Sequence, residues 1–214
     1  MTATLPMRSF LLLSCGLLAA PLLAPAADLR TEIVEANTPE LIALRDTGAQ
    51  ATAAVGMRLV TELTAAMQAG GPLAAVEVCH LKALPLTEPT PAQRAAVTAL
   101  KRTSLRLRNP ANRPDAAEAD ALKHIAALIA AGKPLPAVFL QRVNAKPAPS
   151  AAAPEWRVYR PVMTQPACLA CHGDPAKQPP ELRALLGQKY PADTATGYDT
   201  GEWRGLIRAT LAQP

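Results

Sequence analysis

Aromatic residues are scarce in this sequence, at 3% of its 214 residues. Proteins that bind single-stranded nucleic acids stack the bases on aromatic side chains, and too few are present here for such a surface. A block of basic charge is also absent, because the formal net charge is only +5 and the lysines and arginines are spread along the chain. That distribution is typical of an ordinary solvated surface. We therefore expect no nucleic-acid partner.

The apolar run at the N-terminus is too short and too irregular for a membrane span. It covers residues 9–23, follows Arg8, contains Pro21 and ends in the small residues Ala24-Pro25-Ala26-Ala27. A membrane-spanning helix needs about 20 predominantly apolar residues. The pattern is instead typical of a cleaved secretory signal peptide.

Cleavage of this peptide defines the expected mature protein. We expect residues 1–27 to be removed and residues 28–214 to form a single domain exported to the periplasm. The alternative is a lipoprotein, because Leu12-Leu13-Ser14-Cys15 loosely resembles a lipobox. We expect no transmembrane or kinase segment after Pro214, and therefore expect the protein to act through a partner or as a carrier.

Removal of the signal peptide leaves an odd number of cysteines. Of the four in the sequence, Cys79, Cys168 and Cys171 remain. In an oxidising compartment a disulfide framework would use an even number, so at least one thiol needs another role. Cys168-Leu169-Ala170-Cys171-His172 has the form CxxCH, the sequence signature of c-type haem attachment.

The chemistry of haem attachment explains the CxxCH spacing. Two thiols add across the two vinyl groups of one porphyrin, while the adjacent imidazole reaches the iron from the same side. The export signal supports this interpretation because attachment occurs outside the cytoplasm. A thioredoxin-type redox pair would leave His172 unexplained, and zinc would need a second pair of ligands. We therefore expect one covalent haem c, held through Cys168, Cys171 and His172, with His172 as an iron ligand.

The occupant of the sixth iron position would decide what the protein does. Candidates are Cys79, His80, His124 and Met163. Cys79 and His80 are adjacent and cannot both face the iron, because a helix turns by about 100° per residue. Periodicity does not choose between them. His124 is typical of a helix surface, and Met163, five residues before Cys168, would pack on the porphyrin without ligating.

Hydrophobic periodicity and turn residues predict the secondary structure. The pattern favours α+β, with a mainly antiparallel sheet, flanking helices and a long N-terminal helix. The expected helices are 40–67, 72–84 after a break at Gly70-Gly71, 115–131 and 181–186, and the expected strands are 97–108, 137–143, 156–162 and 203–211 around a flexible loop at 145–154.

Three arginines alternate along the predicted strand 97–108. Arg102, Arg106 and Arg108 would lie on one of its faces. Paired guanidinium donors suit the two propionates of a haem, so we include them as candidate cofactor-binding residues. The alternative is a solvated sheet face.

Several motifs also resemble a known family. They are, in order, Arg102-Thr103-Ser104, Arg108-Asn109-Pro110-Ala111-Asn112-Arg113-Pro114-Asp115, Tyr159-Arg160-Pro161, Cys168-Leu169-Ala170-Cys171-His172-Gly173, Tyr190-Pro191, Asp193, Ala195-Thr196-Gly197-Tyr198 and Gly201-Glu202-Trp203-Arg204-Gly205. With these the chain resembles, over nearly all of its expected mature length, the c-type haem domain family once known only as a domain of unknown function. It differs at Ala192 and Thr194, where the family tends to have an acidic and a basic residue.

The resemblance implies a PAS-like α+β fold and a single haem. Members occur alone or as extracytoplasmic input modules of histidine kinases and chemoreceptors, which implies redox or gas sensing. It also implies that Cys79 is the distal iron ligand. Our hypothesis is a His172/Cys79 haem protein that responds to redox state or to NO or CO and acts on a redox or signalling protein, with a homodimer left open.

Two other haem functions remain open, besides a structural or metal-binding module without haem, which would be colourless. A simple periplasmic electron-transfer cytochrome would keep both iron ligands in both oxidation states. A haem enzyme of the peroxidase type would need an open iron position and a distal acid or base. His80 is the candidate for that group if Cys79 does not ligate. With three histidines in the chain, we favour sensing or electron transfer over catalysis.

Overall fold

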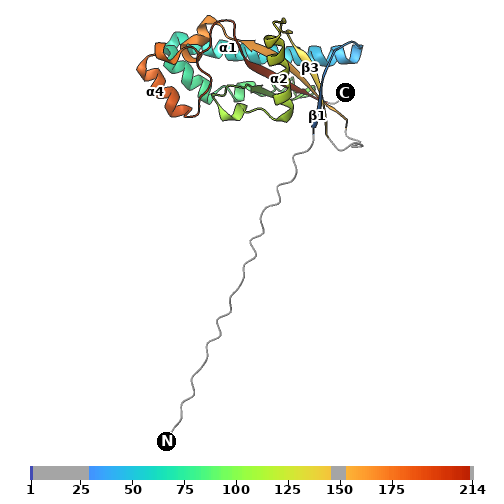
Figure 1. Ribbon diagram of the computed structural model, residues 1–214, viewed down its shortest axis with the longest axis horizontal. Coiled ribbons are helices and arrows are strands. Elements are labelled where there is room, and N and C mark those ends of the chain that lie inside the picture. Colours follow the sequence, from blue (N-terminus) through green and yellow to red (C-terminus); the bar gives the residue numbers. More distant parts are fainter. Residues whose placement is uncertain (2–28, 146–152, 213–214) are drawn as a thin grey trace.

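The computed structural model describes residues 1, 29–145 and 153–212, so the predicted signal peptide with Cys15 and most of the predicted loop 145–154 lie outside the described residues. The described chain forms a five-stranded antiparallel sheet in the order β1-β3-β4-β5-β2, with helices packed against it (Figure 1). The prediction of an α+β fold with an antiparallel sheet is confirmed. The elements are β1 (Leu29–Val34), α1 (Pro39–Leu81), β2 (Val97–Thr103), α2 (Ala116–Ala130), β3 (Phe139–Ala145), β4 (Glu155–Met163), α3 (Leu169–His172), α4 (Pro180–Lys189) and β5 (Trp203–Leu211).

The two longest helices cover opposite faces of the sheet. Val158 and Tyr159 are consecutive on β4, so their side chains point to opposite faces. Val158 packs in a cluster with Ala51 of α1, whereas Tyr159 packs with Leu122 and Ile125 of α2. The sheet therefore separates an α1 side from an α2 side.

Helix α1 begins at the N-cap Thr38 and is broken near its C-terminal end. Gly70 has φ −156° and Gly71 has φ +66°, values outside a helix, and Pro72 follows directly. A positive φ is readily adopted only by glycine, so Gly71 suits this break. The predicted interruption at Gly70-Gly71 is confirmed, and the segment after it ends at Leu81. That segment carries Cys79.

The strand β2 ends earlier than predicted. Its pairing with β5 stops at Thr103 opposite Leu206. Beyond it, Ser104 Oγ accepts a hydrogen bond from the Arg106 N–H at 3.2 Å, and such side-chain bonds to the local backbone compete with a strand ladder. Arg106 therefore lies in a loop, and the prediction that the strand continues to residue 108 with three arginines on one face is wrong.

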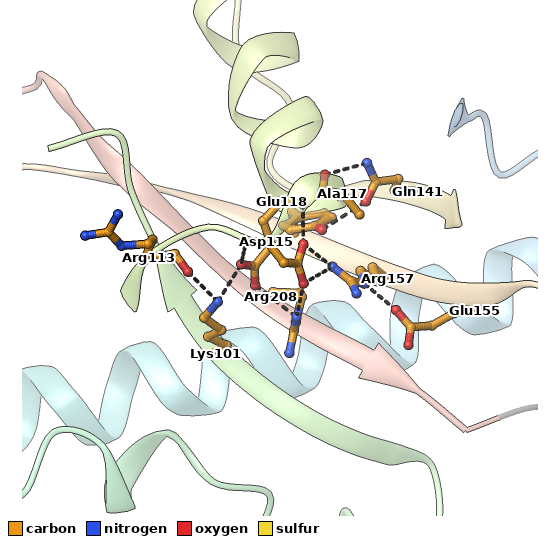
Figure 2. A network of polar contacts seen from close by, with 10 residues as sticks. Lys101, Arg113, Asp115, Ala117, Glu118, Gln141, Glu155, Arg157 and Arg208 are labelled. Carbon is orange, nitrogen blue, oxygen red and sulfur yellow. Dashed lines mark hydrogen bonds and ion pairs between the residues drawn. The ribbon is translucent and has the colours of Figure 1, made fainter. Parts of the chain in front are cut away.

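The α2 side contains a buried network of charged groups (Figure 2). Glu118 is fully buried, with Oε2 2.6 Å from Lys101 Nζ and Oε1 2.9 Å from an Arg208 nitrogen. Asp115 forms a capping box with Glu118 and pairs with Arg157 at 2.8 Å. These contacts join the N-terminus of α2 to β2, β4 and β5 on the face opposite α1.

Within the part of the chain that the structure describes, no helix has the length and apolar character needed to cross a membrane.

Candidate functional site

A cavity of about 410 Å³ lies on the α1 side of the sheet. Its volume falls in the range of about 300 to 1,000 Å³ found for small-molecule sites. Its wall combines α1, the end of β2 and the loop after it, β4, β5 and the CxxCH turn. All seven site residues predicted from the sequence line it, namely Cys79, Arg102, Arg106, Arg108, Cys168, Cys171 and His172.

The CxxCH motif forms one tight turn. Cys168 ends the short 3-10 helix Pro166–Cys168, and α3 follows at once. Residues three apart on a helical turn lie on the same side, so Cys168 and Cys171 both line the cavity as free thiols. Leu169 and Ala170 line a separate, smaller pocket instead. The spacing therefore directs both thiols into the main cavity.

A hydrogen bond to the 193–198 loop orients His172. Its Nδ1 lies 2.7 Å from the carbonyl oxygen of Ala195. A carbonyl only accepts, so Nδ1 carries the proton and Nε2 keeps its lone pair. Burial, together with nearby Arg108 and Arg204, lowers the pKa of His172 to about 3. A neutral imidazole with a free Nε2 is the form that binds a metal.

Backbone hydrogen bonds connect the same loop to the motif. The N–H of Tyr198 donates to the His172 carbonyl at 2.9 Å, and the N–H of Gly197 donates to the Gly173 carbonyl at 2.8 Å. Gly197 has φ +68°, a conformation that suits glycine. The Ala195-Thr196-Gly197-Tyr198 motif thus fixes the position of His172 through hydrogen bonds to its ring and to the adjacent backbone.

Arg108 holds the CxxCH turn and the 193–198 loop together. Its Nε donates to Asp193 Oδ2 at 2.9 Å, and its Nη2 donates to the carbonyls of Cys171 at 2.6 Å and Ala195 at 3.3 Å. The Arg108 and Asp193 side chains are only 10% and 11% exposed. A propionate would therefore have to compete with these partners for Arg108.

The structure distinguishes Cys79 from His80. Cys79 lines the cavity, whereas His80 does not belong to the described residues of the cavity wall. His80 packs edge-on against the Tyr190 ring, with centroids 5.4 Å apart. Met163 lines the cavity, while His124 contacts Phe139 in the α2 half.

Cys79 and Arg102 influence one another electrostatically. Burial raises the pKa of the Cys79 thiol, while the positive charges of Arg102 and Arg108 oppose that rise. Burial lowers the pKa of Arg102, while Cys79 opposes it. Arg102 Nε is buried and has no hydrogen-bond partner among the described residues. A buried unpaired donor is costly, so a bound acceptor within reach of Arg102 would be favoured.

Sequence reasoning assigned no role to Arg204 or Tyr198. Arg204 lines the cavity, and Tyr198 contacts the His172 ring edge-on at 6.3 Å. Both belong to motifs that carry the family resemblance, which is the signal that could have identified them. Among the described residues, no group of three or more His, Cys, Asp or Glu side chains is arranged to hold a metal ion.

The fold and the site define an α+β protein with a cavity on the α1 side of its sheet. The chain belongs to the Tll0287-like family, whose sequence model matches residues 28–212, and this confirms the resemblance seen in the sequence. Among solved structures, it is similar to the cyanobacterial heme-protein Tll0287, at 22% identity and a TM-score of 0.48, over 83% of this chain and 98% of that one. A comparison with curated proteins found no match.

Proposed function

We propose that this chain is an exported protein with one c-type haem, attached through Cys168 and Cys171 and ligated by His172 and Cys79, that senses redox state or a small gaseous ligand. One observation carries the proposal: both cysteines of the CxxCH motif, His172 and Cys79 line one cavity, and the hydrogen bond of His172 uses Nδ1. Membership of a family that includes the heme-protein Tll0287 supports it.

The residues of the cavity fit a haem. The two thiols have the spacing that attachment needs, and His172 is held in the tautomer that ligates iron. Arg102 brings a buried donor without an acceptor, which suits a carboxylate group. When bound, the haem would supply an iron that cycles between the ferric and ferrous states.

Cys79 would determine the reduction potential of the iron and its access to gaseous ligands. As an anionic thiolate it favours ferric iron and lowers the reduction potential relative to a methionine or histidine ligand. Arg102 favours that thiolate, while burial favours the neutral thiol. A protonated Cys79 is a poor ligand, so its protonation would free the distal side of the cavity for NO or CO.

Sensing differs from simple electron transfer in one respect. A periplasmic electron-transfer cytochrome would keep Cys79 as a ligand in both oxidation states. We do not propose an enzyme of the peroxidase type, because His80, the candidate distal base, is not among the described residues of the cavity wall.

We further propose that the PAS-like α+β domain acts in the periplasm on a redox or signalling partner.

Optical spectra test the ligand assignment. The protein, matured in a periplasm with haem-attachment machinery, is measured oxidised and then reduced with dithionite, beside Cys79→Ala and the adjacent control His80→Ala. We expect thiolate-type low-spin ferric bands in the wild type and in His80→Ala, but not in Cys79→Ala. A ferrous spectrum of the wild type that matches that of Cys79→Ala, as expected if Cys79 leaves the iron on reduction, supports sensing, whereas a ferrous spectrum that still differs from that of Cys79→Ala supports electron transfer. Identical spectra for all three proteins would exclude Cys79 as a ligand.

A further inference from the structure

Two arginines share one aromatic ring at the edge of the cavity. The Arg106 guanidinium carbon lies 4.0 Å from the centroid of the Tyr198 ring, and that of Arg204 lies 5.5 Å from it. Both arginines line the cavity. Among the described residues, neither forms an ion pair with a carboxylate, in contrast to Arg108. Each guanidinium group thus lies near the same ring without an ion-pair partner among the described residues.

Neutral acceptors of the protein fix both guanidinium groups in place. Arg204 Nη1 donates to Ser104 Oγ at 2.7 Å and to the Arg106 carbonyl at 3.0 Å. Arg106 Nε donates to the Thr194 carbonyl at 3.2 Å. In the described chain, the Nη groups of Arg106 and the Nε and Nη2 groups of Arg204 make no hydrogen bond. A guanidinium carries five N–H donors, so most of the donors of this pair remain unused.

We infer that Arg106 and Arg204 together bind one carboxylate of a tetrapyrrole, and that this contact orients the ring before the thiols react. The inference rests on the proposed function and names residues for one part of that site. An anion bound by both guanidinium groups would supply an opposite charge and use the free donors through charge-assisted hydrogen bonds. Two of the other arginines of the wall are less suited, since Arg108 is paired with Asp193 and Arg160 is bonded to Ala49 and Thr52.

The position of the pair links carboxylate binding to the histidine. Tyr198, which carries both guanidinium groups on its ring, donates its N–H to the His172 carbonyl. Its ring also meets the His172 imidazole edge-on. A tetrapyrrole carboxylate held here would therefore fix which edge of the tetrapyrrole lies near Tyr198 and which edge reaches Cys168 and Cys171.

Binding of a metal-free porphyrin tests this inference without iron ligation or covalent attachment. The full chain is purified from a host that lacks the attachment machinery and is titrated with protoporphyrin IX or with its dimethyl ester, by fluorescence. The two probes differ only in their carboxylates. We expect the acid to bind at least about tenfold more tightly than the ester, as charge-assisted hydrogen bonds predict.

The variants are Arg106→Gln with Arg204→Gln, and the exposed Arg113→Gln as a control for the loss of one charge. We expect the double variant to lose the preference for the acid while its affinity for the ester stays unchanged, and Arg113→Gln to behave as the wild type. If the double variant does not fold by circular dichroism, Arg106→Gln alone decides, with an expected loss of at least about threefold in the preference.

The outcomes separate the two proposals. Binding of neither probe to the wild type would overturn the proposed haem site and the carboxylate contact with it. Binding of both probes with equal affinity, or a preference that the arginine variants leave unchanged, would overturn the role of Arg106 and Arg204 while the haem proposal stands.

Discussion

Replacement of Asp193 by asparagine should loosen the whole site, because this carboxylate neutralises Arg108 from a largely buried position. Asp193 Oδ2 accepts from Arg108 Nε at 2.9 Å, and Oδ1 accepts from the Ala195 N–H at 2.8 Å. Arg108 in turn donates to the carbonyls of Cys171 and Ala195. One carboxylate thus stabilises contacts on the motif and on the loop that holds His172.

The magnitude follows from the burial of the pair. Removing one partner of a buried ion pair costs about 3 to 5 kcal/mol, because the other charge is left uncompensated. The amide keeps the volume of Asp193 and an oxygen for the Ala195 N–H, so we expect the lower end, about 3 kcal/mol in the free energy of unfolding. That equals a change of about a hundredfold in the folding equilibrium.

Urea unfolding of the haem-free chain measures the effect. The control is Asp46→Asn, which removes an exposed ion pair. The side chains of Arg45 and Asp46 are 38% and 52% exposed, so this substitution should lower the free energy of unfolding by less than about 1 kcal/mol. A double-mutant cycle with Arg108→Gln should give a coupling of about 1 to 3 kcal/mol. A loss of less than about 1 kcal/mol for Asp193→Asn, or no coupling with Arg108, would refute the reasoning.

Two further predictions concern the scaffold. A Cβ at Gly48 would lie 2.4 Å from Val158 Cβ, so Gly48→Ala should cost about 1 to 3 kcal/mol in the free energy of unfolding in urea as α1 shifts from β4. Equal stability of the variant and the wild type would contradict this close packing. Burial raises the pKa of Asp115, but the Glu118 N–H and Arg157 outweigh it and lower the pKa below 3.8. As the pH falls, the carboxylate is protonated first in the unfolded chain, so the contribution of ionised Asp115 to stability is present above about pH 4 and is lost at lower pH. Midpoints of urea unfolding between pH 5 and pH 2.5 should fall accordingly. Asp115→Asn, which keeps the helix cap, should remove that part of the pH dependence.

Local patterns predicted much of the fold. The strand predicted at 203–211 coincides with β5, and the Asp115 cap, the break at Gly70-Gly71 and the helix before Gly132 were also correct. Strand β1 was missed because it follows the predicted signal peptide directly and, among the described strands, pairs with β3 alone. The extent of β2 was overestimated because alternation continues past Ser104, where the ladder ends.

The candidate site likewise combines residues that the sequence predicts with contacts that only the three-dimensional fold determines. Cys168, Cys171 and His172 form a local motif whose spacing carries its own chemistry. Whether Cys79 or His80 faces the cavity depends on how α1 is rotated against the sheet, which periodicity does not determine. The contacts of Arg108 join residues 63 to 87 positions apart, so no sequence window contains them.

The most direct test of the central claim is the intact mass of the protein after export in a host with haem-attachment machinery, measured on the denatured chain. We predict the mass of residues 28–214 plus one haem, and the mass of the bare chain for a Cys168→Ser, Cys171→Ser variant. A wild-type chain without added mass, or a haem retained by the variant, would contradict covalent attachment through these two thiols.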